Sequence, residues 1–188
     1  WIGKDKRPRL EPRILLEDPS KSYHANTKVS ENDIFDNKLI FGDNLLALKA
    51  LEREYAGKVK CIYIDAPYKT GSAFEHYDDG LEHSIWLGLM RDRLEILWNL
   101  LDKDSGSLWV SIDDNEMPYL RMLLDEVCGR SSFVACNVWQ KRYSRENREA
   151  IGDAHEYIIV YAKDFQNFKL HRNKLPLSEE QAKVYKNP

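Results

Sequence analysis

The sequence predicts an α/β fold with a mainly parallel sheet and an antiparallel pair of strands at its C-terminal end. Between residues 38 and 129, short apolar runs rich in β-forming residues alternate with segments whose leucines recur at helical spacing. Two further strand-like runs then follow one another, separated by a polar stretch, 141–153, that is too long for a tight hairpin turn. Alternating strands and helices are typical of a sheet layered with helices.

The first elements have clear local signals. Residues 38–41 are expected to form a short strand that Gly42 stops. Leucines at 45, 48 and 51 predict a helix, with Asp43 or Asn44 as its N-cap and Gly57 at its end. Residues 59–64 are mostly β-forming and predict the next strand, which leads directly into Asp65.

The strongest helical pattern covers residues 84–102, where apolar residues at 85, 89, 94, 97, 98 and 101 mark one face. The run Asp113-Asp114-Asn115 is expected to cap a helix that Gly129 ends. The other elements expected in chain order are strands over 107–112, 133–139 and 156–162, and a short helix around 179–185.

Composition and charge limit the class of protein. The 188 residues allow one ordinary domain, and the formal net charge of −3 excludes a polycation. No apolar run approaches the ~18–20 residues of a membrane span, and no secretory leader is present, so we expect a cytoplasmic protein. Three cysteines without C-x-x-C spacing are expected to be reduced and buried, and no metal site is expected. The chain begins at Trp1, and we expect it to be a piece of a longer protein.

The tetrapeptide Asp65-Ala66-Pro67-Tyr68 is the clearest candidate for chemistry. It follows a strand directly and so is expected at the carboxyl edge of the sheet, where such folds place their sites. A carboxylate beside a backbone carbonyl offers two acceptors, which match the two hydrogens of an exocyclic amine. The tyrosine ring can stack on the base that bears this amine. A bare D-x-P-Y is also compatible with an ordinary strand end followed by a turn.

The run 62–72, IYIDAPYKTGS, resembles the D-P-P-Y-N-T-G-S segment of amino-group DNA methyltransferases. The resemblance continues in order through residues 76–79, 86–87, 90–94, 106–116, 133–135, 139–141 and 155–163, and it covers about residues 38–163. The arrangement is similar to the permuted, beta-type class, and within it to the modification subunits of type III restriction systems and related site-specific adenine methylases. The implied fold is part of a Rossmann-like, S-adenosylmethionine-dependent methyltransferase sheet.

This resemblance implies methyl transfer from S-adenosylmethionine to the N6 amino group of a flipped adenine in DNA. Asp65, Ala66 through its carbonyl, Pro67 and Tyr68 are then the catalytic residues, with Asp65 and the carbonyl accepting from the amine and Tyr68 stacking on the base. Asp65 and Asp43 are the implied cofactor contacts, although an N-cap explains Asp43 equally well. Double-stranded DNA, a restriction subunit and a second copy in a homodimer are the implied partners.

Two departures from the family pattern affect the expected activity. Ala66 stands where the family has its first proline, and Lys69 where it has asparagine. Alanine keeps the carbonyl but loosens the loop, so Ala66→Pro is expected to raise turnover. None of the nine glycines forms a G-x-G, so the family's Gly-rich cofactor loop is missing. We expect this chain alone to bind the cofactor weakly and to be inactive.

The resemblance and the composition divide the chain into three parts. Residues 1–36 hold three prolines among charges and are expected to form an extended arm. Residues 37–165 are the catalytic half of the methyltransferase domain. Residues 166–188 are expected to start a linker or target-recognition region.

A basic stretch includes the predicted strand over 133–139 and most of the polar segment that follows it. Residues 130–150 carry five basic and two acidic side chains, a local charge of +3. Lys141, Arg142, Arg145 and Arg148 are the candidates for binding DNA phosphates. A solvated loop, partly neutralised by its own glutamates, explains them as well.

Two alternatives to the adenine methyltransferase remain from the sequence. One is an inactive DNA-binding or assembly fragment of such an enzyme. The other is an amino methyltransferase that acts on cytosine N4 or on a protein amide, although Asp65 and the extended match favour adenine.

Overall fold

The computed structural model describes residues 1–23, 27, 28, 30–32, 36–67, 79–143, 152, 154–174, 176 and 178. Its centre is a four-stranded sheet in the order β1-β2-β4-β3. The strands are β1 (Cys61–Asp65), β2 (Ser107–Ile112), β3 (Phe133–Gln140) and β4 (His155–Ala162). β1 and β2 are parallel, and β4 is antiparallel to both β2 and β3, so β4 alone is reversed. The predicted α/β sheet with a C-terminal antiparallel pair is confirmed: the sheet is mixed, and three of its four strands run in the same direction.

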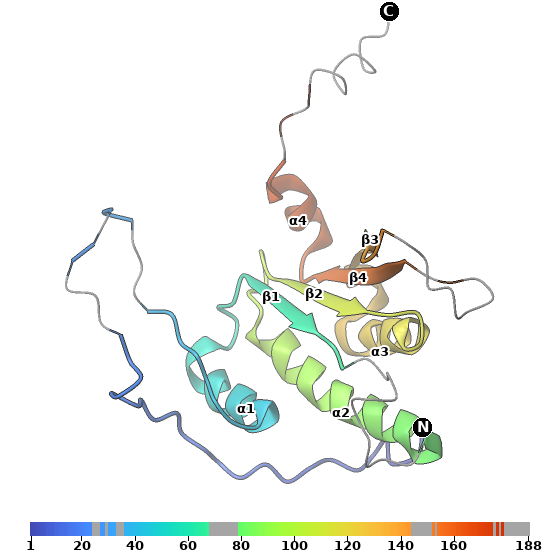
Figure 1. The fold of residues 1–188 in the computed structure, drawn as a ribbon, viewed down its shortest axis with the longest axis horizontal. Helices are drawn as coiled ribbons and strands as arrows, with labels where there is room; N and C mark the ends of the chain where they lie inside the picture. Colours follow the sequence, from blue (N-terminus) through green and yellow to red (C-terminus); the bar gives the residue numbers. More distant parts are fainter. Residues whose placement is uncertain are drawn as a thin grey trace, which may run out of the picture.

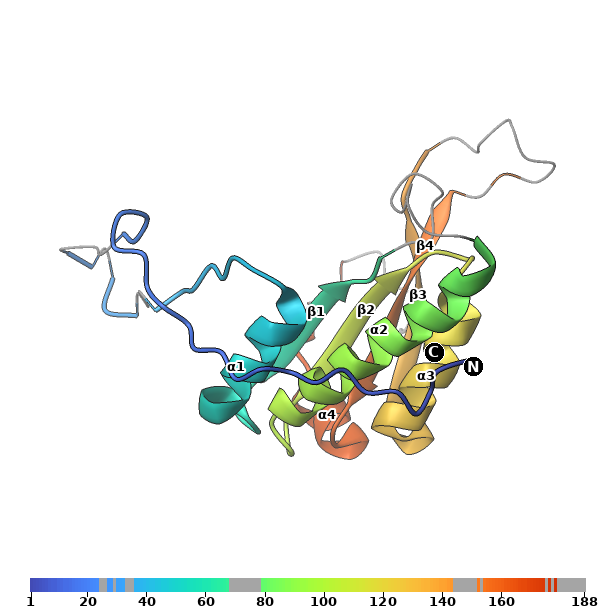
Figure 2. The same cartoon turned by 90° about the horizontal axis from the view of Figure 1, so that it is seen from below.

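Helices cover the sheet unequally. α1 (Asn44–Tyr55), α2 (Asp79–Leu100) and α3 (Met117–Cys128) lie on one side, and the short α4 (Phe165–His171) lies on the other (Figures 1 and 2). A 3₁₀ turn, η1 (Arg130–Ser132), joins α3 to β3. No helix in the described part of the chain is long and apolar enough to span a bilayer.

The core lies between α2, α3 and one face of the sheet. Apolar side chains from the two helices and the central strands are fully buried there: Leu94, Leu108, Val110, Ile112, Leu120, Leu124, Ile159 and Tyr161. The predicted helical stripe of α2 is close to the observed one, but Ile85 is exposed while Trp86, Leu87 and Met90 are buried. The burial of these side chains fixes the position of α2 beneath the carboxyl end of β1.

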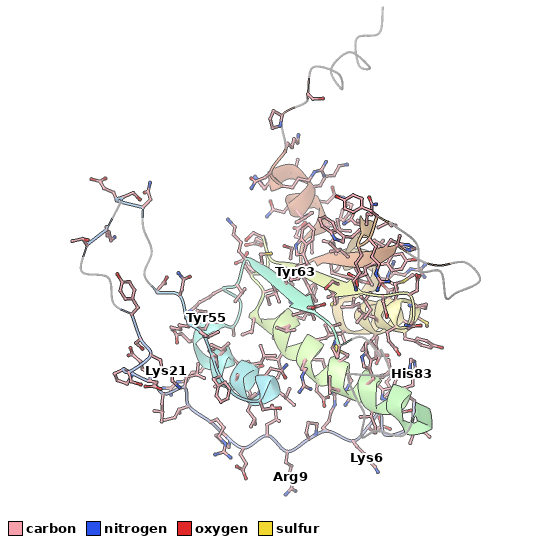
Figure 3. All side chains as sticks on the ribbon, in the orientation of Figure 1. Lys6, Arg9, Lys21, Tyr55, Tyr63 and His83 are labelled. Carbon is pink, nitrogen blue, oxygen red and sulfur yellow. The ribbon has the colours of Figure 1, made fainter. Side chains whose placement is uncertain are left out.

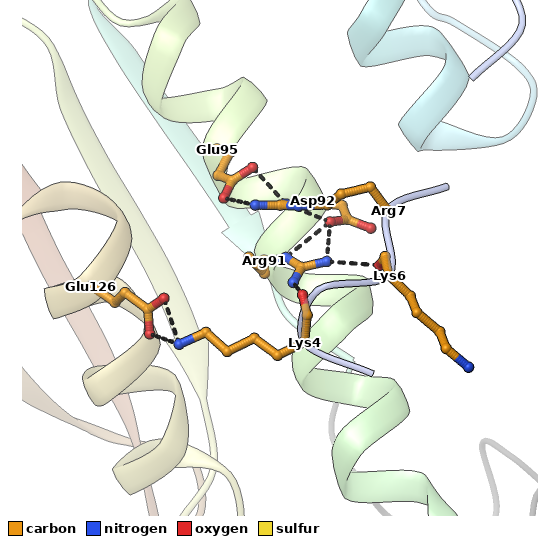
Figure 4. A network of polar contacts seen from close by, with 7 residues as sticks. All are labelled: Lys4, Lys6, Arg7, Arg91, Asp92, Glu95 and Glu126. Carbon is orange, nitrogen blue, oxygen red and sulfur yellow. Dashed lines mark hydrogen bonds and ion pairs between the residues drawn. The ribbon is translucent and has the colours of Figure 1, made fainter. Parts of the chain in front are cut away.

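The N-terminal arm packs along the outside of α2 (Figures 1 and 4). The buried guanidinium of Arg91 donates to the backbone carbonyls of Lys4 and Lys6. Arg7 binds Asp92 and Glu95 on α2, and Lys4 forms an ion pair of 2.8 Å with Glu126 on α3. The arm therefore bridges the two helices.

Several predicted elements differ from the structure. The strand predicted over 38–41 is wrong: these residues form neither helix nor strand, and Leu39 and Phe41 are fully exposed. A short apolar run becomes a strand only where another strand offers it a hydrogen-bond ladder, and among the described residues β1 pairs with β2 alone. The helix predicted around 179–185 lies outside the described residues.

The structure also contains a helix that the sequence patterns did not predict. α4 begins after Asp164, whose carboxylate accepts from the backbone N–H of Asn167 at 2.9 Å. Phe168 of α4 packs near Trp109 of β2, with ring centroids 6.4 Å apart. Because the boundary proposed between residues 165 and 166 falls inside α4, we now propose it after His171.

The predicted burial of the cysteines is correct at one position. All three thiols are free. Cys128 is buried, which raises the pKa of its thiol to about 12, whereas Cys61 and Cys136 are exposed. Both exposed cysteines lie on the two edge strands of the sheet, β1 and β3, and a strand's own sequence does not reveal its place at an edge.

Candidate active site at the carboxyl edge of the sheet

The carboxyl ends of β1, β2 and β3 and the amino end of β4 meet at one edge of the sheet. An open cavity of about 450 Å³ lies at this edge. Side chains from all four strands line it: Tyr63, Asp65, Ser111, Trp139, Glu156 and Ile158. Asp65 is thus placed in a cavity, where a substrate group can reach it.

Asp65 is held by the neighbouring strand. Ser111 is its register partner on β2, and the buried Ser111 hydroxyl donates to Asp65 Oδ1 at 2.9 Å. The backbone N–H of Ala66 donates to the Ser111 carbonyl at 3.3 Å. This second bond gives Ala66 an anchor that a proline at that position lacks. Ser111 was missed by the sequence patterns, because its place opposite Asp65 depends on the register between β1 and β2.

Pro67 is held from the helical layer. Its carbonyl accepts from the indole Nε1–H of Trp86 on α2 at 2.9 Å. Tyr68, the proposed stacking residue, lies outside the described residues. Three consecutive residues, 65 to 67, are therefore each tied to a buried partner.

The cavity walls are largely aromatic and apolar. Tyr63 extends from β1 on the side opposite α1–α3 (Figure 3), and Trp139 stands on β3; each side chain is 60% exposed. Ile158 of β4 lies between them in the lining. Exposed aromatic rings beside a carboxylate suit a flat ring that carries a hydrogen-bond donor. Neither wall residue was predicted as part of the site.

Asp43 is the N-cap of α1. Its carboxylate accepts from the backbone N–H groups of Leu45 and Leu46 at 3.0 and 3.1 Å, and lies 3.9 Å from the guanidinium of Arg93. It does not line the cavity. The capping alternative is observed, while a role in cofactor binding stays a prediction.

Two of the four predicted DNA-binding residues can be placed. Lys141 and Arg142 follow the carboxyl end of β3, at the same edge as Asp65, and are exposed. Lys141 forms an ion pair with Glu156, which lines the cavity. Arg145 and Arg148 lie outside the described residues.

A second polar cluster stands at this edge beside the cavity. The Tyr157 hydroxyl donates to Asp114 at 2.7 Å, and His155 lies 3.0 Å from the same hydroxyl. The hydrogen bond to the Asp114 carboxylate raises the pKa of Tyr157 to about 12. Asp114 therefore accepts from a residue of β4. Of the residues expected to cap α3, Asp113 accepts from the backbone N–H of Glu116.

The amino-acid sequence of the chain is similar to those of known DNA-modifying proteins. Residues 59–188 match the model of a DNA methylase family. The chain is 34% identical to the StyLTI Mod subunit, a type III restriction-modification enzyme of Salmonella typhimurium, over its whole length and 33% of that protein. It is 35% identical to the EcoP15I Mod subunit of Escherichia coli, over 87% of this chain and 30% of that protein. It spans about a third of the length of these relatives.

Solved structures of methyltransferases are also similar. The PvuII DNA methyltransferase, cytosine-N4-specific, shares 16% identity with a TM-score of 0.46, over 63% of this chain and 47% of that chain. The family model covers more than half of the chain and includes the whole sheet edge with Asp65 and its cavity. This chain belongs to the DNA methylase family.

Proposed function

We propose that the protein is a site-specific DNA methyltransferase that transfers a methyl group from S-adenosylmethionine to the N6 amino group of a flipped adenine. The observation that carries this proposal is Asp65, which is the last residue of β1, is oriented by Ser111 and lines an aromatic cavity. Membership of the DNA methylase family supports it.

The chain's own residues serve mainly to orient the amine. We assign to the Asp65 carboxylate and the Ala66 carbonyl the acceptance of the two amine hydrogens, which directs the nitrogen lone pair away from both acceptors. A negative carboxylate at this point also stabilises the positive charge that develops on nitrogen as it gains a bond. Positioning supplies most of the catalysis in such an in-line displacement. Tyr63 and Trp139 can cover the faces of the base, together with Tyr68.

The described residues fit one side of a site for S-adenosylmethionine. When bound, the cofactor supplies an electrophilic methyl group on a positively charged sulfur. The Asp65 carboxylate and the aromatic walls suit a cationic and partly aromatic ligand. We keep Asp65 and Asp43 as the proposed cofactor contacts.

We further propose a restriction-modification role. Relatives at 34–38% identity over most of this chain are named as type III Mod subunits. Double-stranded DNA, a restriction subunit and a second copy of the chain are the proposed partners. The three free thiols suit the reducing cytoplasm, where we propose that the protein acts.

The direct test uses the full-length protein with labelled S-adenosylmethionine and double-stranded DNA. We expect label in the DNA and N6-methyladenine after nucleoside analysis. If the product were N4-methylcytosine, the target base would be cytosine and not adenine. Label in protein and none in DNA would contradict the proposal.

Lys141→Ala combined with Arg142→Ala is expected to weaken DNA binding by the full-length protein. The slope of log K against log salt concentration is negative, and each phosphate contact contributes about −0.9 to it. Loss of the two side chains should therefore make the slope less steep by about one to two units. Fluorescence anisotropy at several salt concentrations measures it. Lys103→Ala is the matched control, because Lys103 is exposed in the turn before β2, at the opposite edge of the sheet. An unchanged slope in the double variant would favour a solvated loop.

A further inference from the structure

Trp86 lies beneath the candidate active site without lining it. Its side chain is 5% exposed and belongs to the main core cluster. The cavity is lined from the four strands, whereas Trp86 belongs to α2. Its indole N–H nevertheless reaches the edge of the sheet and donates to the Pro67 carbonyl at 2.9 Å.

This hydrogen bond differs from the other two that hold residues 65–67. The other two bonds are both made with Ser111 on the adjacent strand, whose hydroxyl donates to Asp65 and whose carbonyl accepts from the N–H of Ala66. Proline has no backbone N–H, so the carbonyl is the single polar backbone group through which residue 67 can be fixed. In the described part of the chain, Trp86 alone ties this residue to the helical layer.

The indole ring is itself fixed by neighbours on two helices. His83, one turn earlier on α2, stacks on it with centroids 6.3 Å apart and planes inclined by 14°. His83 meets the ring of Tyr119 edge-on at 4.0 Å and lies 3.3 Å from the buried Glu116 carboxylate. Both of these partners belong to the start of α3. The orientation of the indole N–H is therefore set by packing.

We propose that Trp86 is a positioning residue for methyl transfer: by holding the Pro67 carbonyl, it fixes the direction of the Ala66 carbonyl and of the loop that leads to Tyr68. This role rests on the proposed function. Ser111 fixes the start of the loop and Trp86 fixes its end, so that the acceptor carbonyl lies between two anchored points. Releasing the second anchor lets this acceptor rotate away from the amine.

The test compares tryptophan variants of the full-length enzyme. Trp86→Phe removes the donor while keeping an aromatic ring, and we expect kcat to fall by about tenfold to a hundredfold. The KM for DNA should stay within twofold, because Trp86 is not among the residues that line the cavity. Trp98→Phe is the matched control on the same helix: it is partly buried and contacts Lys163. Its kcat should stay within twofold.

A shape-preserving replacement separates the hydrogen bond from packing. Incorporating 3-benzothienylalanine at position 86 puts sulfur in place of the N–H and keeps the ring outline, so the protein should fold with an unchanged melting temperature. A tenfold lower kcat in this variant supports the role, and a kcat within twofold of wild type overturns it. A wild-type enzyme that methylates no DNA overturns the proposed function and this role together. An active wild type with an equally active isostere overturns the role of Trp86 alone.

Discussion

Asp65→Asn in the full-length protein is expected to reduce the rate of DNA methylation by about 10²–10³-fold, the usual cost of losing one preorganised electrostatic contact. Asparagine has nearly the same shape and retains one acceptor oxygen. It removes the negative charge beside the developing positive charge on the amine, and its NH₂ can face the amine as a second donor. Single-turnover methylation at saturating DNA and cofactor measures the effect on the chemical step.

Two further variants show whether the loss is specific to this carboxylate. Ser111→Ala removes the hydroxyl that donates to Asp65 at 2.9 Å, so it should lower the rate by about tenfold, the equivalent of ~1.4 kcal/mol of orientation. Asp104→Asn removes an exposed carboxylate from the turn before β2, at the opposite edge, and should leave the rate unchanged. If Asp65→Asn retained more than a tenth of the wild-type rate, the assignment of Asp65 would be wrong.

The place of Asp65 could be predicted because it depends on local sequence alone. A β-forming run that ends in a polar residue puts that residue at the strand's carboxyl end, and β1 ends at Asp65. The alternation of strands and helices then predicted the parallel pair β1–β2. The same kind of local sequence pattern predicted that Asp43 is the N-cap of α1.

The partners of Asp65 could not be predicted in this way. Ser111 and Trp86 contact residues 65–67 across 46 and 19 positions of sequence. Which residue stands opposite Asp65 depends on the register between two strands, and a shift by one position would have brought Val110 or Ile112 there instead. Trp86 is a core residue, and its hydrogen bond to Pro67 depends on how α2 lies beneath β1.

The N-terminal arm shows the same limit. Its prolines and charges predicted an extended segment, and residues 1–23 form neither helix nor strand. No pattern of residues indicated that Arg91, inside an amphipathic helix, would be buried and donate to the arm's backbone carbonyls. A single charged residue among apolar neighbours is as easily assigned to the solvent face of the helix.

Arg91→Met is expected to lower the free energy of unfolding by about 2–4 kcal/mol, because breaking a buried charged network leaves polar groups without their partner. The guanidinium is 3% exposed, donates to the carbonyls of Lys4 and Lys6, and binds Asp92 at 2.7 Å (Figure 4). Methionine fills similar space but donates to none of them. Urea denaturation measures the loss, and limited trypsin digestion should cleave the released arm faster.

Arg7→Met is the matched comparison, since it removes a second arginine that binds the same carboxylate. Arg7 is half exposed, and its pairs with Asp92 and Glu95 lie at the surface, where water and salt screen them. Its loss should cost about 0–1 kcal/mol. If the two variants lost the same stability, Arg91 would act through its charge alone. A larger loss for Arg91→Met means that the backbone carbonyls of the arm need this donor, and that residues 1–7 are part of the folded domain.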